Sequence, residues 1–384
     1  MPPHDFSLTQ QKIMVIVPML TGSLSLFSSM TIMAMMLKSK KKLSSSYRRI
    51  VFGRSMADMV YSIAHVASSL PNYSDTAWGA MGNQQTCEAQ GFVLFFGGAV
   101  GGNYMMFLCI YFCNAIYFQM SKKTFSQKVE PFLHLFATGY GLTAGLYLLV
   151  MDYFNPGARS LVCWISSFPI NCIENDLVDC IRGDDANKMR FYFFLLPVII
   201  IFSVIILTMG LISWKEIKQA RLNKKYQFQI SKKTREENTT NTEENDKNDN
   251  RQSNAGRDSL SLTWLRARSL SNNVPSKRTK SVTIQATLYV MSFFLSWIFV
   301  CVNTLTTRRG GESRVPFGMR LMGRIFNPLQ GFTTILVYTR PHVIALRRTH
   351  QEYSWLKAFF VVITSGGDND GKVGRERRLS RMSV

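Results

Sequence analysis

Seven stretches of this chain are long and apolar enough to cross a lipid bilayer, and that pattern constrains its fold most. They are residues 13–37, 50–70, 91–118, 132–151, 191–214, 282–302 and 315–338. A helix needs about 20 residues to cross a ~30 Å hydrocarbon core. Five of the seven contain no Asp, Glu, Lys or Arg. The sequence therefore predicts an all-α membrane protein, built as a bundle of seven transmembrane helices.

The formal net charge of +21 belongs mainly to the segments between these stretches. Of the 45 Lys and Arg residues, 34 lie in 38–49, 119–131, 215–281 and 339–384, and only eight lie in the alternate segments. Basic loops stay on the cytoplasmic side of a membrane. The pattern predicts an N-terminus outside and a C-terminus inside, in the plasma membrane. It gives no reason to expect nucleic acid as a partner.

This topology divides the chain into five parts. A short extracellular tail (1–12) precedes helices one to five (13–214), and a cytoplasmic loop (215–281) precedes helices six and seven (282–338). Residues 339–384 are expected to form a cytoplasmic amphipathic helix and tail. The loop contains "REENTTNTEENDKNDNRQSNAGRDS", which has no large apolar side chain and is predicted to be disordered. Its basic flanks favour binding to membrane lipids, to a cytosolic partner, or to both.

Three short motifs predict covalent modification. Asn72 begins an Asn-Tyr-Ser glycosylation sequon in the first outer loop. "RRLS", which ends at Ser380, and "RARSLS", around Ser269, resemble phosphorylation targets of basophilic kinases. A phosphate at either serine would add about −2 charges beside arginines and weaken a basic surface. Matches this short also arise by chance.

Four of the seven cysteines fall on the predicted outer side, where disulfides persist. Four cysteines allow three pairings. A Cys87–Cys163 bridge would fix the second outer loop over the bundle, and Cys172 and Cys180 would then close a small loop. Free or intermolecular thiols are the alternative. The other three cysteines lie within spans and lack His or carboxylate neighbours, so buried thiols are expected and no metal site.

Two arginines, Arg320 and Arg324, lie inside the seventh apolar stretch. The uncharged residues 325–338 give about 21 Å of helix, which is shorter than the hydrocarbon core. The two arginines are one turn apart on one face, and charges within membranes usually face the bundle. One interpretation is that they reach the outer headgroups or pair with Glu88 or Asp152. The other is a pocket that receives a carboxylate or phosphate.

Other residues in the spans have structural or functional interpretations. Pro328 should kink its helix as a hinge, and Gly331 permits close helix packing beside it. Arg54 and Asp58 are four residues apart and are expected to form a structural ion pair or a switch. Asn103 is expected to hydrogen-bond between helices or to contact a ligand. The candidate ligand-binding set is Arg320, Arg324, Glu88, Trp164 and Asn103.

Several patches resemble one branch of the seven-helix G protein-coupled receptors. "CEAQGF" from Cys87, "CWI" from Cys163, "SMADMVYS" around Asp58 and "NPLQGFTTILVYTRP" from Asn327 are similar to the cyclic-AMP receptor-like and secretin-like superfamily. Span three ends in "CNAIYFQM", without the Asp/Glu-Arg-Tyr triplet of rhodopsin-like receptors. Only about a dozen residues precede the first span, which argues against a peptide-hormone receptor.

This resemblance implies a receptor that activates a heterotrimeric G protein through the inner ends of helices three, five and six. Its agonist would be an extracellular small molecule, and the two arginines favour an anion. The seventh span has no Lys to carry retinal. The spans offer no catalytic set of paired carboxylates, Ser/His or metal ligands, so we expect neither an enzyme nor a cofactor. The alternative is a multi-pass transporter or channel for an anionic solute, which the lack of an internal repeat disfavours.

Overall fold

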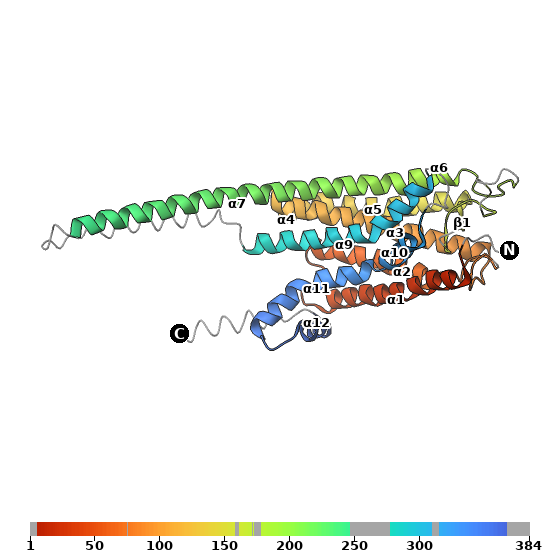
Figure 1. Cartoon of the computed structure of the whole chain (residues 1–384), viewed down its shortest axis with the longest axis horizontal. Coiled ribbons are helices and arrows are strands. Elements are labelled where there is room, and N and C mark those ends of the chain that lie inside the picture. The colour runs from red at the N-terminus through yellow and green to blue at the C-terminus, as the bar shows by residue number, and fades with distance from the viewer. Residues whose placement is uncertain are drawn as a thin grey trace.

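The structure is a computed structural model that describes residues 6–74, 76–157, 161–170, 172, 178–245, 277–308 and 315–366. It is a bundle of long helices lying side by side, with one helix projecting far beyond the others (Figure 1). The helices are α1 (Leu8–Lys38), α2 (Ser46–Ala67), α3 (Gln84–Cys113), α4 (Lys122–Thr124), α5 (Glu130–Val150), α6 (Ala186–Arg190), α7 (Leu196–Asn245), α9 (Lys277–Arg308), α10 (Phe317–Phe326), α11 (Gln330–Thr349) and α12 (Trp355–Thr364).

Five of the described helical segments are long and apolar enough to span a membrane: 8–38, 84–118, 122–150, 186–225 and 281–306. The two other predicted spans are α2, which buries Arg54 and Asp58, and the pair α10–α11. Together these elements form the expected seven-helix bundle. Assignment of the N-terminal end to the outside rests on the distribution of basic loops.

The third helix of the bundle is its core. Most of the α3 span is buried, and α2, α5, α7 and α9 all pack against it. The close approach of α2 requires a glycine, because a Cβ on Gly97 would lie 2.7 Å from the backbone nitrogen of Tyr61. Within the described residues, single π-helical turns interrupt the regular α-helical hydrogen bonding at Asn114–Phe118, Phe125–Val129 and Phe191–Leu195.

The seventh apolar stretch is two helices, not the single kinked helix that the sequence predicts. Helix α10 ends at Phe326 and α11 begins at Gln330. Pro328 has no N–H to donate, and the turn is held by the Asn327 and Leu329 amides, which donate to Gly323 O at 3.0 Å and Phe326 O at 3.2 Å. The break points α10 in a direction of its own at the N-terminal end of the bundle (Figure 1).

The end of α7 also differs from the sequence prediction. Helix α7 runs to Asn245, so residues 235–245 of the segment predicted to be disordered are helical. Arg and Glu in this stretch have high helix propensity, whereas its Thr and Asn residues do not; the extension is favoured because a helix that already exists grows without a new nucleus. Residues 246–276, with Ser269, lie outside the described residues, as does Ser380.

The tail forms the expected helix with a shifted boundary. Helix α11 continues through Pro341 to Thr349, and α12 follows after a turn, capped by the Ser354 side chain. Ala358 and Val362 of α12 are buried against the bundle, whereas Leu356 and Phe360 are exposed. An apolar exposed face suits contact with lipid at the membrane boundary.

Candidate ligand-binding site

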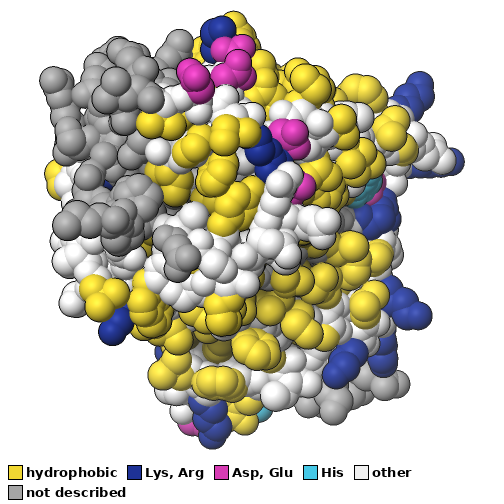
Figure 2. Space-filling view, turned by 90° about the vertical axis from the view of Figure 1, so that its right-hand side faces the viewer, with side chains coloured by type: hydrophobic (Ala, Val, Ile, Leu, Met, Phe, Trp, Pro, Cys, Tyr) yellow, Lys and Arg dark blue, Asp and Glu magenta, His cyan; other side chains and the backbone are white. Residues whose placement is uncertain are grey.

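A cavity of about 220 Å³ lies among the helix ends and loops on the side of the bundle that carries the N-terminus. Strands β1 (Phe154–Pro156) and β2 (Cys163–Ile165) pair antiparallel at this end, and β2 lines the cavity. Apolar side chains are widespread on the face that this end presents (Figure 2). Among the described residues that line the cavity there are three arginines and no Asp or Glu. The described lining of the cavity is therefore rich in positive charge.

Two of the three arginines are held at their places by backbone carbonyls. Arg190, the last residue of α6, donates from Nε and Nη2 to Ile165 O at 3.1 and 2.8 Å. Arg320 on α10 donates from Nε to Val315 O at 3.3 Å, and its guanidinium lies 5.7 Å from the centre of the Phe6 ring. These carbonyl contacts orient the two guanidinium groups.

Arg324 is the third arginine, four residues further along α10. Its side chain is buried (9% exposed), and in the part of the chain that the structure describes its Nε and Nη2 have no hydrogen-bond partner. A buried ion that lacks a partner costs several kcal/mol. Such a group calls for an anion or a polar ligand inside the cavity.

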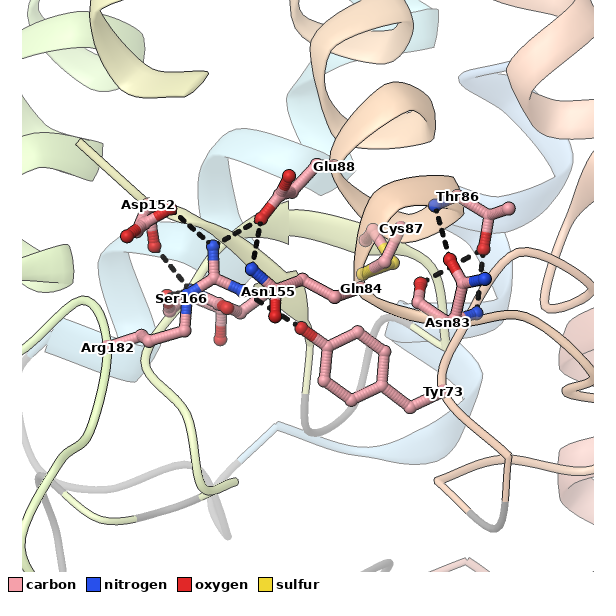
Figure 3. A network of polar contacts seen from close by, with 11 residues as sticks. Tyr73, Asn83, Gln84, Thr86, Cys87, Glu88, Asp152, Asn155, Ser166 and Arg182 are labelled. Carbon is pink, nitrogen blue, oxygen red and sulfur yellow. Dashed lines mark hydrogen bonds and ion pairs between the residues drawn. A yellow bond between two sulfur atoms is a disulfide. The ribbon is translucent and has the colours of Figure 1, made fainter. Parts of the chain in front are cut away.

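The two carboxylates that the sequence offered as partners of these arginines are bound elsewhere. Arg182 donates from Nη2 to both Glu88 and Asp152, and from Nη1 to the Tyr73 hydroxyl at 3.1 Å (Figure 3). Partial burial acts to lower the pKa of Arg182, but the bonds to the two carboxylates raise it above its ordinary value. Glu88 is therefore outside the cavity lining, and pairing of Arg320 or Arg324 with these acids is not observed.

Both outer disulfides have the pairing that we favoured. Cys87–Cys163 joins the start of α3 to β2, and Cys172–Cys180 closes the small loop. Gln90 adds a second tie, because its Oε1 accepts the Cys163 amide at 3.1 Å. Together these bonds fix β2 over α3, and Trp164, the next residue of β2, lines the cavity.

A second, smaller cavity of about 30 Å³ lies against the same aromatic side chains. Trp164, Phe194 and Trp297 line both cavities, whereas Asn103 lines only the small one. Within the described residues, Asn103 Nδ2 and Trp297 Nε1 are buried without a hydrogen-bond partner. Asn103 thus lies apart from Arg320 and Arg324, across a wall of aromatic rings.

Sequence reasoning missed several residues of the site. Arg190 precedes the fifth apolar stretch directly, and a search for arginines at the outer edges of all spans would have found it. Tyr61, Phe194 and Trp297 gave no such signal, because aromatic side chains are frequent on buried helix faces. The Tyr61 hydroxyl donates to Asn327 Oδ1, which places the turn between α10 and α11 against α2.

The predicted ion pair of helix two forms deep in the bundle. Arg54 Nε lies 3.5 Å from Asp58 Oδ2, and both side chains are buried. Arg54 also donates from Nη1 to Gly101 O at 3.1 Å, and Thr334 Oγ1 donates to Asp58 Oδ2 at 3.4 Å. The pair thereby connects α2, α3 and α11. Such a buried pair is costly to break by removing one member.

Two other predicted features of the sequence have a definite place in the structure. Gly331 lies against α1, where its amide donates to Ser25 Oγ at 2.8 Å. A Cβ on Gly331 would meet the Ser25 carbonyl oxygen at 2.7 Å. Asn72 of the glycosylation sequon is 1% exposed. This burial argues against an oligosaccharide on Asn72 in the folded loop.

Comparison with known proteins supports the fold. No protein-family model matches the sequence, and no curated protein matches it. Among solved structures, squid rhodopsin matches with a TM-score of 0.57 and 13% sequence identity. The match covers 91% of this chain and 87% of the squid rhodopsin chain. At this identity the likeness establishes a rhodopsin-like seven-helix fold, and the narrower resemblance to the cyclic-AMP receptor-like branch has no matching family model.

Proposed function

We propose that this chain is a plasma-membrane receptor of the G protein-coupled type, which binds an anionic small molecule in the cavity at the outer end of its bundle. The bound anion activates a heterotrimeric G protein through the inner ends of helices three, five and six, here α3, α7 and α9. The seven-helix fold supports the class of protein. The arginines that line the cavity support a ligand of negative charge.

One observation carries the choice of an anion. Arg324 is buried in a cavity whose described lining contains two more arginines and no carboxylate, and its Nε and Nη2 have no partner among the described residues. A carboxylate or phosphate accepts charge-assisted hydrogen bonds from guanidinium groups in two parallel contacts. Low local dielectric strengthens such contacts. The same anion would remove the cost of the unpaired buried charge.

The inner ends of the three helices are joined by hydrogen bonds that an activating movement would have to break. Lys215 on α7 donates to the carbonyls of Ile116 and Tyr117, at the end of helix three, at 2.6 and 3.0 Å. Thr283 on α9 donates to Glu216 Oε1 on α7 at 2.8 Å. Helix α9 also lines the cavity through Trp297. Helix α9 thus lines the proposed ligand cavity at one end and bonds to α7 at the other.

The decisive test measures nucleotide exchange. The purified chain in nanodiscs would be mixed with a panel of heterotrimeric G proteins, with and without a library of anionic metabolites. We expect at least one anion to accelerate exchange above the rate with empty nanodiscs. Arg324→Gln should lower the affinity for that anion by roughly 10- to 150-fold, which corresponds to the loss of one charged hydrogen bond.

The control is Arg347→Gln, on the exposed part of α11 at the inner end, which should leave anion potency unchanged. Anion flux in liposomes without nucleotide exchange would favour the alternative, a transporter or channel for an anionic solute. Anion potency that is the same in Arg324→Gln and in the parent chain would refute the proposed site.

A further inference from the structure

We propose that the ligand is an amphipathic anion with an unbranched apolar tail and an oxygen atom near the tail end. Its charged group binds the arginines of the outer cavity, and its tail passes the aromatic wall into the inner cavity, where Asn103 donates to the oxygen. This inference rests on the proposed function and specifies the ligand class.

The lining of the outer cavity combines charged and apolar side chains. Arg320 and Arg324 come from α10, whereas Met14, Leu94 and Val300 contribute apolar surface from α1, α3 and α9. A compact inorganic anion would leave this apolar surface in contact with water. An anion that carries hydrocarbon satisfies both kinds of side chain, because burial of each methylene contributes about 0.8 kcal/mol.

Three aromatic side chains separate the two cavities. Trp164 lies edge-on to Phe194 with ring centres 5.4 Å apart, and Phe194 lies 6.0 Å from Trp297. They come from β2, the π-helical turn before α7, and α9, three elements that are distant in the sequence. Phe194 and Trp297 are buried, so a tail passes this wall only when these rings change rotamer.

The inner cavity is narrow and nearly apolar. Gly98, Gly102, Val198 and Ile201 line it, and a branched group would not fit between α3 and α7. Its volume of about 30 Å³ exceeds the ~10–15 Å³ that one small group or water molecule needs. It therefore suits the end of a linear chain.

Asn103 gives the inner cavity a buried hydrogen-bond donor. The side chain is 4% exposed, and its Nδ2 has no hydrogen-bond partner among the described residues. Trp297 Nε1, on the shared wall, is a second buried donor without a described partner. A buried donor that stays unsatisfied costs about 1–3 kcal/mol. An oxygen acceptor near the tail end removes this cost, so an ω-hydroxyl or ω-carbonyl group is expected to favour binding.

The test uses straight-chain alkanoates of about two to eight carbons and their ω-hydroxy analogues as probes. Binding to the full chain in nanodiscs is followed by tryptophan fluorescence, with empty nanodiscs subtracted for lipid partitioning. We expect affinity to rise about fourfold per methylene up to one optimal length and then to fall. At that length the ω-hydroxy analogue should bind more tightly, and Asn103→Leu should abolish its advantage.

A matched pair of variants tests the inner cavity. Val198→Phe fills it and should shorten the optimal chain, whereas Ile199→Phe, on an exposed position of the same helix, should not. Gly102→Ala places one methyl group in the same space, 3.3 Å from Ile201 Cδ1, and serves if the larger residue prevents folding. Binding that depends on Arg324 but not on chain length would overturn this inference and leave the proposed function standing. Absence of Arg324-dependent binding by every probe would also overturn this inference, and the nucleotide-exchange test with the full set of anions would then decide the proposed function by itself.

Discussion

At the scale of single residues, Arg324 is expected to lower the stability of the ligand-free chain and to favour binding of an anion. Its guanidinium is buried with Nε and Nη2 unpartnered in the described chain, while Arg190 and Arg320 contact carbonyl oxygens. Natural sites often retain a group that destabilises the empty protein because the ligand needs it. The position of this side chain is therefore better explained by what enters the cavity than by the fold.

Replacement of Arg324 should separate these two roles. We expect Arg324→Gln to stabilise the ligand-free chain, by an amount within the ~1–4 kcal/mol seen when buried ions are replaced, and to weaken anion binding at the same time. Arg347→Gln is the control: its exposed side chain has a carbonyl partner, so its effect on stability should be small. Thermal unfolding in nanodiscs, with and without a bound anion, measures both. A destabilised Arg324→Gln chain would show that the charge has a structural partner.

At the scale of elements, Arg182 fastens the outer loops. It joins α3 through Glu88, the end of α5 through Asp152 and the first outer loop through Tyr73. Its backbone also pairs with Phe168, whose amide donates to Arg182 O at 2.9 Å. The loop held in this way carries Trp164 and Ser166, which line the cavity.

Loss of the Arg182 contacts should make the loop more mobile and ligand release faster. We expect Arg182→Gln to raise amide hydrogen exchange in the described residues of 153–166 and to speed anion dissociation, because the ion pairs with Glu88 and Asp152 disappear. Lys188→Gln removes an exposed ion pair with Asp185 and should change neither quantity. Unchanged exchange in Arg182→Gln would mean that the disulfides and the bonds from Gln90 and Arg190 hold the loop without Arg182.

Glycine positions offer a second test at this scale. Gly331→Ala would place a Cβ 2.7 Å from the Ser25 carbonyl oxygen, so α11 must move away from α1. We expect a loss of about 1–3 kcal/mol in the free energy of unfolding. Gly210→Ala, where the new Cβ meets nothing within 4 Å, should be neutral or gain up to about 1 kcal/mol from helix propensity. Equal thermal midpoints for the two variants would contradict the close packing.

The sequence predicted the elements better than their junctions. Apolar length alone identified the seven spans, and the outer location of Cys87 and Cys163 led to the observed bridge. The break after Phe326 was not predicted, because Pro328 is compatible with a kink or with a full stop. The cavity was not predicted: Arg190, Trp297 and Arg324 are far apart in the sequence, and only packing reveals that they line one space.

At the scale of the whole molecule, the ligand cavity and the inner contacts lie at opposite ends of the same helices. Helix α9 contributes Trp297 to the cavity, and at its inner end Gln285 donates to the Tyr47 hydroxyl at 2.7 Å. The Tyr47 and Tyr289 hydroxyls are 3.1 Å apart, so α2 joins the same set of contacts. A rigid helix that contacts both ends can transmit a shift if the inner contacts hold one of two arrangements.

Lys215 provides the sharpest test of that arrangement. Its Nζ bonds to the Ile116 and Tyr117 carbonyls join α7 to the end of helix three. If these bonds hold the receptor in its resting arrangement, Lys215→Met removes about 1.5–3 kcal/mol from that state. Basal nucleotide exchange on the coupled G protein should then rise roughly tenfold or more without any anion. Lys218→Met is the matched control, because Lys218 lies over the Trp214 ring on the same helix and should leave exchange unchanged. A Lys215→Met chain that binds anions normally but shows no higher basal exchange would place the resting contacts elsewhere, with Glu216 and Thr283 as the next pair to separate.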